Sequence, residues 1–324
     1  MILAGDVGGT KTILALFDGV NCLKKQQFSS ANYQTFSALL TEFLADVDNT
    51  TITAVCIGVA GVVDNGRCAT TNLPWILDSR KIGARMNSEK VWLLNDLEAT
   101  AWGLLELPEQ QFVELNAEAH SQPGNIAVLA AGTGLGEAIV AWDGNKHHVL
   151  ASEGGHADFA PHNEQEIALL RHLMKKHPDH VSCELLISGE GLINIYQFLK
   201  YTHESAINPQ TEGQMLERDP AAVIGEAGVA GSDALCVEAL TLFCRLYGAE
   251  AGNLALKCLP YGGIYLAGGI AAKILPVLQQ GDFMHAFLAK GRCRTVLQKL
   301  SVKVCTNPEV ALLGALSYAR NNDN

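Results

Sequence analysis

The stretch Asp6-Val7-Gly8-Gly9-Thr10-Lys11 decides the fold, because it is a glycine turn set between two short apolar runs. The run before it spans residues 2–5, and the run after it is Ile13-Leu14-Ala15-Leu16-Phe17. Short apolar runs on both sides of a glycine cluster predict two adjacent strands joined by a tight turn. We therefore expect the chain to open with a strand, a glycine turn and a second strand.

The same arrangement returns in the middle of the chain. Ile126–Ala131 is followed by the glycine-rich segment Gly132-Thr133-Gly134-Leu135-Gly136 and then by Ala138–Trp142. A single glycine hairpin is common, but two such units, one in each half, indicate a chain built from two related halves. A third glycine segment, Gly268-Gly269, ends a strand-like run late in the chain.

Between these units the sequence alternates strand-like and helix-like segments, which is typical of an α/β protein. Asn95-Asp96 stands at the end of a strand-like run, where open α/β sheets bind their ligands. The polar, turn-rich stretch 108–124 is the expected domain crossing. Further strands are expected at Ala54–Val59 and Val91–Leu94, and helices at Tyr33–Val47, Leu97–Leu107, Glu164–Lys176, Asp233–Leu259 and from Pro308 to about Ala319.

Length and charge exclude several classes of protein. The 324 residues suffice for two domains, and a net charge of −11 excludes the basic surface that nucleic acid or an anionic membrane requires. No apolar run reaches the length of a membrane span, so we expect a cytoplasmic protein without nucleic-acid or membrane partners. The 9 cysteines never form a C-x-x-C pair, which predicts reduced thiols and no Cys or His metal site.

An acidic protein can hold a phosphate only through backbone N–H groups, a metal and a few placed side chains, and glycine-rich turns allow the backbone to approach. None of the three glycine segments has the P-loop pattern, and Gly132-x-Gly134-x-Gly136 lacks the spacing of a dinucleotide-binding fingerprint. Each segment alone is a weak signal. Their order along the chain is far more specific.

That order resembles the phosphate-1, phosphate-2 and adenosine segments of the actin-like ATPase and sugar kinase superfamily. Three further motifs, Leu94-Asn95-Asp96, the segment 152–161 (SEGGHADFAP) and the segment 188–192 (SGEGL), make the chain similar to the bacterial glucokinase family of the proteobacterial type. The resemblance runs from Gly5 to about Gly314. The family's function would be transfer of a phosphoryl group from ATP to O6 of D-glucose, giving glucose 6-phosphate and ADP.

The resemblance implies a two-domain actin-like ATPase fold of the ribonuclease H-like kind, each domain having a central mixed sheet flanked by helices. The expected small domain is 1–107 plus about 306–324, and the expected large domain is about 108–305, with sugar and ATP in the cleft between them. It also implies a homodimer formed through the large domain. The apolar tract Asp233–Leu259 could supply its face, or could be an interior helix.

The sugar site follows from matching positions. Asp96 resembles the family's catalytic base for the O6 hydroxyl, and Asn95 resembles a sugar anchor. Glu153, His156 and Glu184 match the remaining hexose ligands, and such side chains suit hydroxyls that both donate and accept hydrogen bonds. Without the resemblance, Asp96 reads as a helix N-cap and His156 as a structural histidine.

The nucleotide site follows in the same way, with ATP and Mg²⁺ as the implied co-substrate and metal. Asp6 is expected near Mg²⁺ through water, because magnesium keeps several of its waters. The role of Lys11 stays open. The residues implied to contact ATP are Gly8, Gly9 and Thr10, then Gly132, Thr133 and Gly134, and finally Gly268 and Gly269.

Two other functions share parts of this pattern. A kinase for fructose, mannose or an N-acetylhexosamine would carry the same ATP motifs, and the sequence does not show whether there is room beside C2 of the sugar. A sugar-sensing repressor would need an N-terminal DNA-binding helix pair and a basic surface. The early first strand and the acidic charge argue against the repressor.

Overall fold

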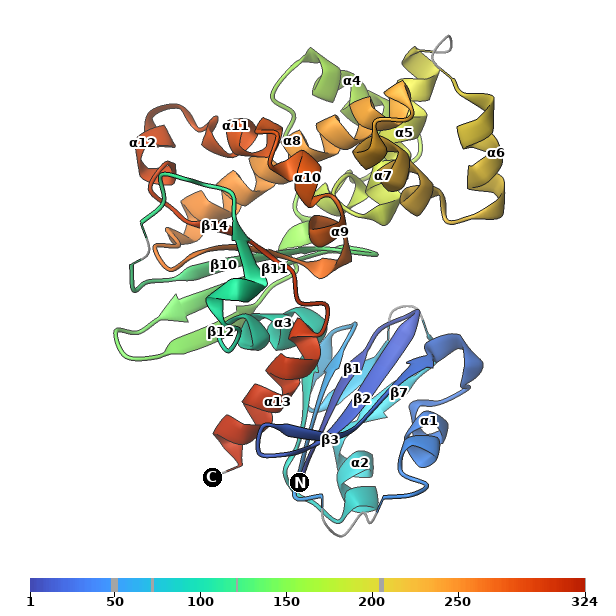
Figure 1. Ribbon diagram of the computed structural model, residues 1–324, viewed down its shortest axis with the longest axis vertical. Helices are drawn as coiled ribbons and strands as arrows, with labels where there is room; N and C mark the ends of the chain where they lie inside the picture. Colours follow the sequence, from blue (N-terminus) through green and yellow to red (C-terminus); the bar gives the residue numbers. More distant parts are fainter. Residues whose placement is uncertain (48–51, 71–72, 121, 204–206, 324) are drawn as a thin grey trace. The chain divides into compact units, whose positions relative to one another are not determined.

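The computed structural model describes residues 1–47, 52–70, 73–120, 122–203 and 207–323. Its internal contacts divide the chain into two compact units (Figure 1). Unit 1 comprises Met1–Gln111 and Asn307–Asn324, and unit 2 comprises Phe112–Thr306. Unit 1 is therefore built from two separate stretches of chain, with unit 2 inserted between them.

Unit 1 is organised around a five-stranded mixed sheet in the order β3-β2-β1-β4-β8. Strands β1 and β2 are antiparallel, with Val7 opposite Thr12, while β1, β4 and β8 are parallel. The expected opening hairpin is thus confirmed. The strands are β1 (Ile2–Val7), β2 (Lys11–Asp18), β3 (Asn21–Ser29), β4 (Ala54–Val59) and β8 (Val91–Asn95).

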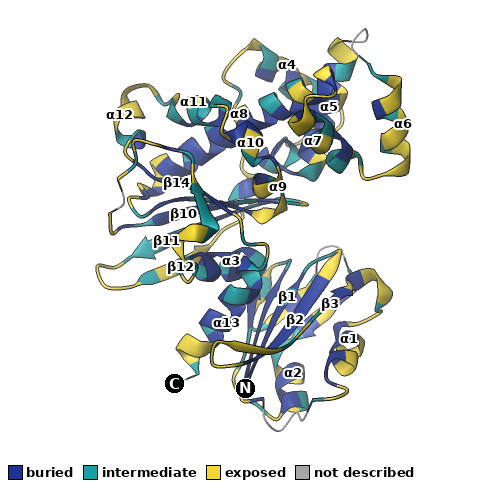
Figure 2. Cartoon of the chain, viewed as in Figure 1, coloured by how far each residue is buried: buried dark blue, intermediate teal, exposed yellow. Residues whose placement is uncertain are grey.

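Helices cover both faces of this sheet, because successive side chains of each strand point to opposite sides. Leu3 and Val7 pack in one apolar cluster with residues of α1 (Phe36–Phe43) and α2 (Ser79–Met86). Ile2 and Ala4 pack in another with residues of α3 (Asp96–Leu104) and α13 (Val310–Asn322). In Figure 2, β1 and β2 are mostly dark, and therefore buried, whereas the edge strand β3 is largely exposed. A small sheet of β5 (Val63–Asp64), β6 (Arg67–Ala69) and β7 (Ile76–Asp78) completes unit 1.

Helices α3 and α13 pack against each other unusually closely, since glycines stand at the contact. A Cβ on Gly314 would lie 1.7 Å from the carbonyl oxygen of Ala99, and one on Gly103 would lie 1.9 Å from that of Val310. Helix α13 begins at Val310, so Pro308 precedes it rather than occupying its first turn as expected. The side chain of Asn307 there accepts a hydrogen bond from the backbone N–H of Glu309 at 2.8 Å.

Unit 2 repeats the plan of unit 1 with six strands in the order β12-β11-β10-β13-β14-β9. Strand β10 is antiparallel to β11 and parallel to β13, as β1 is to β2 and β4. The prediction of two related halves is confirmed at the level of sheet topology. The strands are β9 (Phe112–Glu114), β10 (Ile126–Ala131), β11 (Leu135–Trp142), β12 (His147–Ala151), β13 (Gly263–Ala267) and β14 (Val302–Cys305).

A large helical layer packs on the sheet of unit 2, with α8 (Ala234–Cys258) at its centre. Most apolar side chains of α8 are buried within the unit, so the tract Asp233–Leu259 is an interior helix and not a free apolar face for a partner subunit. The remaining helices are α4 (Glu164–Leu173), α5 (Gly189–Thr202), α6 (Pro209–Glu217), α7 (Pro220–Ala230), α9 (Gly268–Lys273), α10 (Leu275–Leu278), α11 (Asp282–Leu288) and α12 (Arg294–Leu297).

The sequence predicted reduced cysteines and no membrane-spanning segment, and both predictions can be compared with the described residues. All 9 cysteines are free, and seven of them are buried. In the described part of the chain, no single helix is long and apolar enough to cross a membrane. Helices α7 and α8 meet that condition only when joined, and a bend of 97° separates them.

Candidate active site

In unit 1 the predicted catalytic and metal-binding residues gather at one edge of the sheet. Asp6 is the second-last residue of β1 and pairs with Gly58 on the adjacent strand β4. Gly58 in turn pairs with Leu94 on β8. Asn95 and Asp96 follow Leu94 directly. Because β1, β4 and β8 are parallel, their carboxyl ends meet at this edge, which is where α/β sheets bind ligands.

Asn95, rather than Asp96, is the N-cap of α3. The Asn95 side-chain oxygen accepts a hydrogen bond from the N–H of Leu97 at 2.9 Å, and its amide donates to the carbonyl of Gly61 at 3.1 Å. Asp96 is the first helical residue, and its Oδ1 also accepts from Leu97 N–H at 2.9 Å. The positive end of the helix stabilises a carboxylate there. The capping that the sequence offered as an alternative role for Asp96 is therefore performed by its neighbour.

Asp6 has an unusual electrostatic environment. Burial, followed by the nearby charge of Asp96, raises the pKa of Asp6 to about 6, while Lys11 acts in the opposite direction. The residues that the structure describes include no group of three Asp, Glu, His or Cys side chains able to enclose a metal. Two neighbouring carboxylates suit Mg²⁺ that takes its other ligands from phosphate and water. Asp6, with the charge of Asp96 beside it, therefore fits the implied metal.

The glycine turn after β1 is braced by a residue that the sequence did not single out. Gly8 N–H donates to the carbonyl of Lys11 at 3.0 Å, which closes the turn. The buried Ser30 hydroxyl donates to the Gly8 carbonyl at 2.8 Å, and the Ser30 N–H donates to the Thr10 carbonyl at 3.0 Å. Ser30 follows directly after β3, so only the strand pairing brings it to the turn.

In unit 2 the two predicted nucleotide segments lie side by side. Ala130 pairs with Ala267 in the parallel β10–β13 ladder, so the turns that follow these strands share one edge of the sheet. Gly268 has φ +81°, and a Cβ on it would lie 2.4 Å from the carbonyl oxygen of Ala131. Glycine is therefore required at this position. Gly132 and Gly269 have open space beside them, and Thr133 is exposed.

Glu153 and His156 form one part of the predicted sugar site. Glu153 precedes a short 3₁₀ turn, Gly154–His156, and His156 is its last residue. A hydrogen bond from His156 N–H to the Glu153 carbonyl at 3.0 Å closes the turn. Their side chains lie 3.9 Å apart, between His156 Nε2 and Glu153 Oε2, and are 58% and 65% exposed. Both side chains are thus accessible to a small polar molecule.

Glu184 joins the sugar segment to the glycine turn of the same unit. Its Oε2 accepts a hydrogen bond from Leu135 N–H at 2.9 Å, and a Cβ on Gly134 would lie 2.3 Å from that oxygen. Ser188, the N-cap of α5, donates its hydroxyl to the Glu184 carbonyl at 2.7 Å. A carboxylate expected to bind sugar is therefore held by the turn expected to bind phosphate.

Backbone hydrogen bonds tie the two sugar segments together. Cys183 N–H donates to the Ala157 carbonyl and Phe159 N–H donates to the Val181 carbonyl, both at 2.9 Å, around a β-bridge between Asp158 and Ser182. The structure thus brings Glu153, His156 and Glu184 into one region of unit 2 although they are far apart in sequence. No sequence pattern signalled this pairing.

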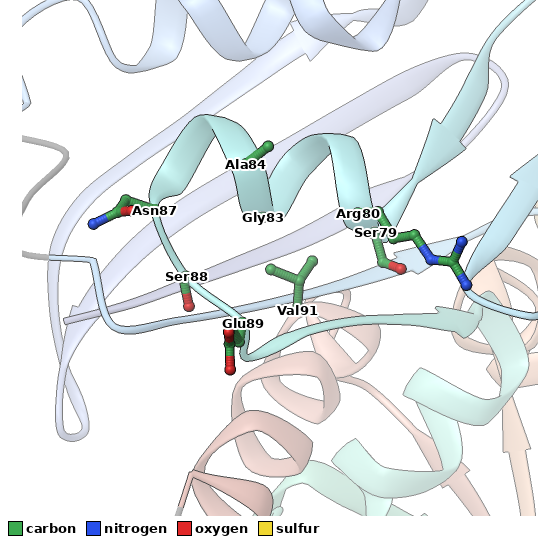
Figure 3. Close-up of a pocket in the computed structure, with 8 residues that line it drawn as sticks. All are labelled: Ser79, Arg80, Gly83, Ala84, Asn87, Ser88, Glu89 and Val91. Carbon is green, nitrogen blue, oxygen red and sulfur yellow. The ribbon is translucent and has the colours of Figure 1, made fainter.

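A surface hollow elsewhere in unit 1 is unrelated to these residues. It has a volume of about 540 Å³ and is open, and Figure 3 shows α2 above it with Asn87, Ser88 and Glu89 at one end. It lies beside the amino end of β8, whereas Asn95 and Asp96 lie at the carboxyl end. None of the predicted site residues lines it.

The two mixed sheets, each with a glycine turn between its first two central strands, form the actin-like ATPase fold that sugar kinases use. A family model described as Glucokinase matches residues 3–322. The chain belongs to the glucokinase family, as the motif order predicts, and it is an enzyme of that class.

Individual relatives agree with this assignment. The chain is 41% identical to a glucokinase of Trichormus variabilis, over 97% of each protein. Among solved structures it resembles glucokinase from an Antarctic psychrotroph, with a TM-score of 0.83, 28% identity and 99% of each chain covered. It also has the fold of glucokinase from Balamuthia mandrillaris solved in complex with glucose, with a TM-score of 0.81, 21% identity and coverage of 99% and 93%.

Proposed function

We propose that this enzyme transfers the γ-phosphoryl group of ATP to O6 of D-glucose, with Asp96 as general base. The observation that carries the proposal is the meeting of Asp6, Asn95 and Asp96 at the carboxyl edge of one sheet, in a chain of the glucokinase family. A side-chain carboxylate within hydrogen-bond reach of the sugar hydroxyl is the kind of group that serves as a general base.

In the proposed reaction, the O6 oxygen of glucose attacks the γ-phosphorus while the bond from that phosphorus to the ADP oxygen breaks on the opposite side. The proton of O6 passes to the carboxylate of Asp96. Asn95 fixes the orientation of Asp96 by capping the same helix. Phosphoryl transfer needs little covalent help from the protein, so positioning and charge stabilisation provide most of the rate enhancement.

The glycine turns supply backbone N–H groups for the phosphates of ATP, and Gly268-Gly269 contacts the nucleoside. Mg²⁺, held by Asp6 through water, would neutralise phosphate charge. Glu153, His156 and Glu184 bind the sugar hydroxyls. Glu184 contacts the end of the turn Gly132–Gly134, where its carboxylate accepts a hydrogen bond from Leu135 N–H. In this proposal, unit 2 therefore has a residue that binds the sugar directly beside a turn that binds phosphate.

The test is release of ADP from ATP and Mg²⁺ in a coupled assay with a panel of sugars: glucose, fructose, mannose and N-acetylglucosamine. We expect glucose to give the highest kcat/KM, and the product to be glucose 6-phosphate. The variant Glu217→Gln changes an exposed residue of α6 and should behave as the unaltered enzyme. Equal or greater activity on another hexose would replace glucose as the proposed substrate.

A further inference from the structure

Two buried carboxyl groups lie behind the sugar segments of unit 2. Glu137 on β11 is 1% exposed and Glu250 on α8 is 5% exposed. In the described part of the chain, the Oε1 atom of each has no hydrogen-bond partner from another residue's donor group. Buried acids are rare unless paired, and an unsatisfied buried oxygen is costly, so the pair needs an explanation.

Glu137 supports the turn that carries Glu153 and His156. The hydroxyl of Ser152 donates to the Glu137 carbonyl at 2.7 Å. A Cβ on Gly154 would lie 2.5 Å from Glu137 Oε2 and 3.0 Å from its Cβ, so the backbone of the turn rests directly on this side chain. The turn and the side chain of Glu137 are therefore in direct contact.

Glu250 reaches the other sugar segment. Its Oε2 accepts from the thiol of Cys183, the residue before Glu184, at 3.4 Å, and from the Asn253 amide at 2.9 Å. Asn253 in turn accepts from the ammonium group of Lys290 at 2.6 Å. The two carboxyl groups thus link β11, α8 and both sugar segments through one buried polar cluster.

The charges around the pair favour one proton between the two groups. Burial, the charge of Glu250 and a hydrogen bond between the two carboxyl groups raise the pKa of Glu137 to about 7, while Lys257 lowers it. The charged groups beyond Glu250 are Lys290 and Glu166. Cys183 and Tyr247 also face the pair, and both are neutral because burial raises the pKa of each side chain. A proton shared between the two carboxyl groups would satisfy both unpartnered oxygens.

We propose that Glu137 and Glu250 share one proton and act as positioning residues that hold the segments Ser152–His156 and Cys183–Glu184 in the geometry that binds glucose. This inference rests on the proposed sugar site. Loss of the shared proton leaves two like charges in a buried space, so the pair separates and the segments resting on it move. Glucose affinity therefore decreases as pH rises.

The decisive variant is Glu137→Gln, which keeps the size of the side chain and donates a hydrogen bond at every pH. We expect the glucose KM of the unaltered enzyme to rise about tenfold between about pH 6 and about pH 8.5, the effect of losing one buried hydrogen bond. In Glu137→Gln the glucose KM should stay constant over that range, with kcat changed less than about twofold. Glu217→Gln, an exposed control, should keep the original pH profile.

Thermal unfolding gives a readout that needs no substrate. The folded protein binds the proton of Glu137 up to about pH 7, whereas an unfolded glutamate releases it near the ordinary pKa of 4.5. The folded state is then favoured less as pH rises from 4.5 to about 7. The melting temperature of the unaltered enzyme should fall over this interval relative to that of Glu137→Gln.

These outcomes separate the two proposals. A chain without glucose-dependent ADP release refutes the proposed function, and the melting curves then still decide whether the pair holds a proton. A glucose KM with the same pH dependence in Glu137→Gln as in the unaltered enzyme overturns the positioning role. If Glu137→Gln does not fold, Glu250→Gln provides the same neutral donor from α8, and the same comparison applies.

Discussion

The glycine turns of the two units occupy the same place in the same sheet topology, yet their surroundings differ. In unit 1, Val7 pairs with Thr12 across Gly8–Lys11, whereas in unit 2, Ala131 pairs with Leu135 across the shorter Gly132–Gly134. The first turn is braced by the neutral hydroxyl of Ser30, and the second by the carboxylate of Glu184.

The flanking residues differ in the same way. Asp6 is the second-last residue of β1, and Ala130 is its counterpart on β10. Asn95 ends β8, the outer parallel strand of unit 1, and Asp96 follows it, whereas in unit 2 Cys305 ends β14 and Thr306 follows. A repeated sheet therefore supplies two similar scaffolds. The chemistry of each unit comes from the positions at which the two repeats differ.

The largest effect is expected at Asp96, which has no acidic counterpart in unit 2. Asp96→Asn keeps the size of the side chain and its ability to accept from Leu97 N–H, but it cannot take a proton at neutral pH. We expect kcat to fall at least about a hundredfold. The melting temperature should be unchanged, because Asn95 still caps α3.

Glu89→Gln is the matched control for Asp96→Asn. It removes the same charge at the opposite end of β8, where the side chain is exposed, and should leave kcat unaltered. An Asp96→Asn variant that retains more than about a tenth of the original kcat would contradict the assignment of a general base. Isothermal titration with ATP would show separately whether nucleotide binding survives.

A smaller effect should distinguish two glycines of the unit 2 turn. In Gly134→Ala the new Cβ would lie 2.3 Å from Glu184 Oε2, the flexible end of a side chain, so the carboxylate moves while the fold remains. We expect the glucose KM to rise about tenfold, since a misplaced ligand loses about one buried hydrogen bond.

Gly132→Ala provides the comparison, because nothing lies within 4 Å of its Cβ position. The glucose KM should stay the same in this variant, whatever happens to the KM of ATP. Initial-rate measurements with each substrate varied in turn give both constants. A rise of equal size in the glucose KM of both variants would show that the contact with Glu184 has no bearing on sugar binding.

The smallest effect concerns the brace of the unit 1 turn. Ser30→Ala removes the hydrogen bond to the Gly8 carbonyl and the contact with the hydroxyl of Thr12, which should lower the free energy of unfolding by about 1 kcal/mol. Ser29→Ala, at an exposed neighbouring position, should leave the free energy of unfolding almost unchanged. Urea denaturation measures both, and equal losses would mean that Ser30 does not brace the turn.

The sequence predicted the repeated hairpins and the position of Asn95-Asp96 because these depend on local patterns. Ala54–Val59 and Ile126–Ala131 are strands with the expected bounds, since continuous apolar runs next to glycine leave few alternatives. The expected helix Tyr33–Val47 is only Phe36–Phe43, because Thr35 caps it and Leu44 ends it. Boundaries of this kind depend on individual cap hydrogen bonds.

Long-range pairing could not be predicted in this way. The brace from Ser30, the bridge between Asp158 and Ser182 and the carboxyl pair of Glu137 and Glu250 each join segments distant in sequence. Glu137 lies in an apolar strand, where a single acid gives no periodic signal. Only the pairing of β11 with its neighbours and the packing of α8 bring these groups together.

The late return of α13 to unit 1 has a consequence for how the protein is made. Leu312, Ala315, Leu316 and Ala319 of this helix complete an apolar cluster with β1 and β4, yet they are synthesised only after all of Phe112–Thr306. On the ribosome, unit 2 can therefore fold while one apolar face of the unit 1 sheet still lacks α13, one of the two helices that cover it. The first strands to emerge are therefore among the last to be fully buried, and exposed apolar surface of this kind favours aggregation until the last helix is made.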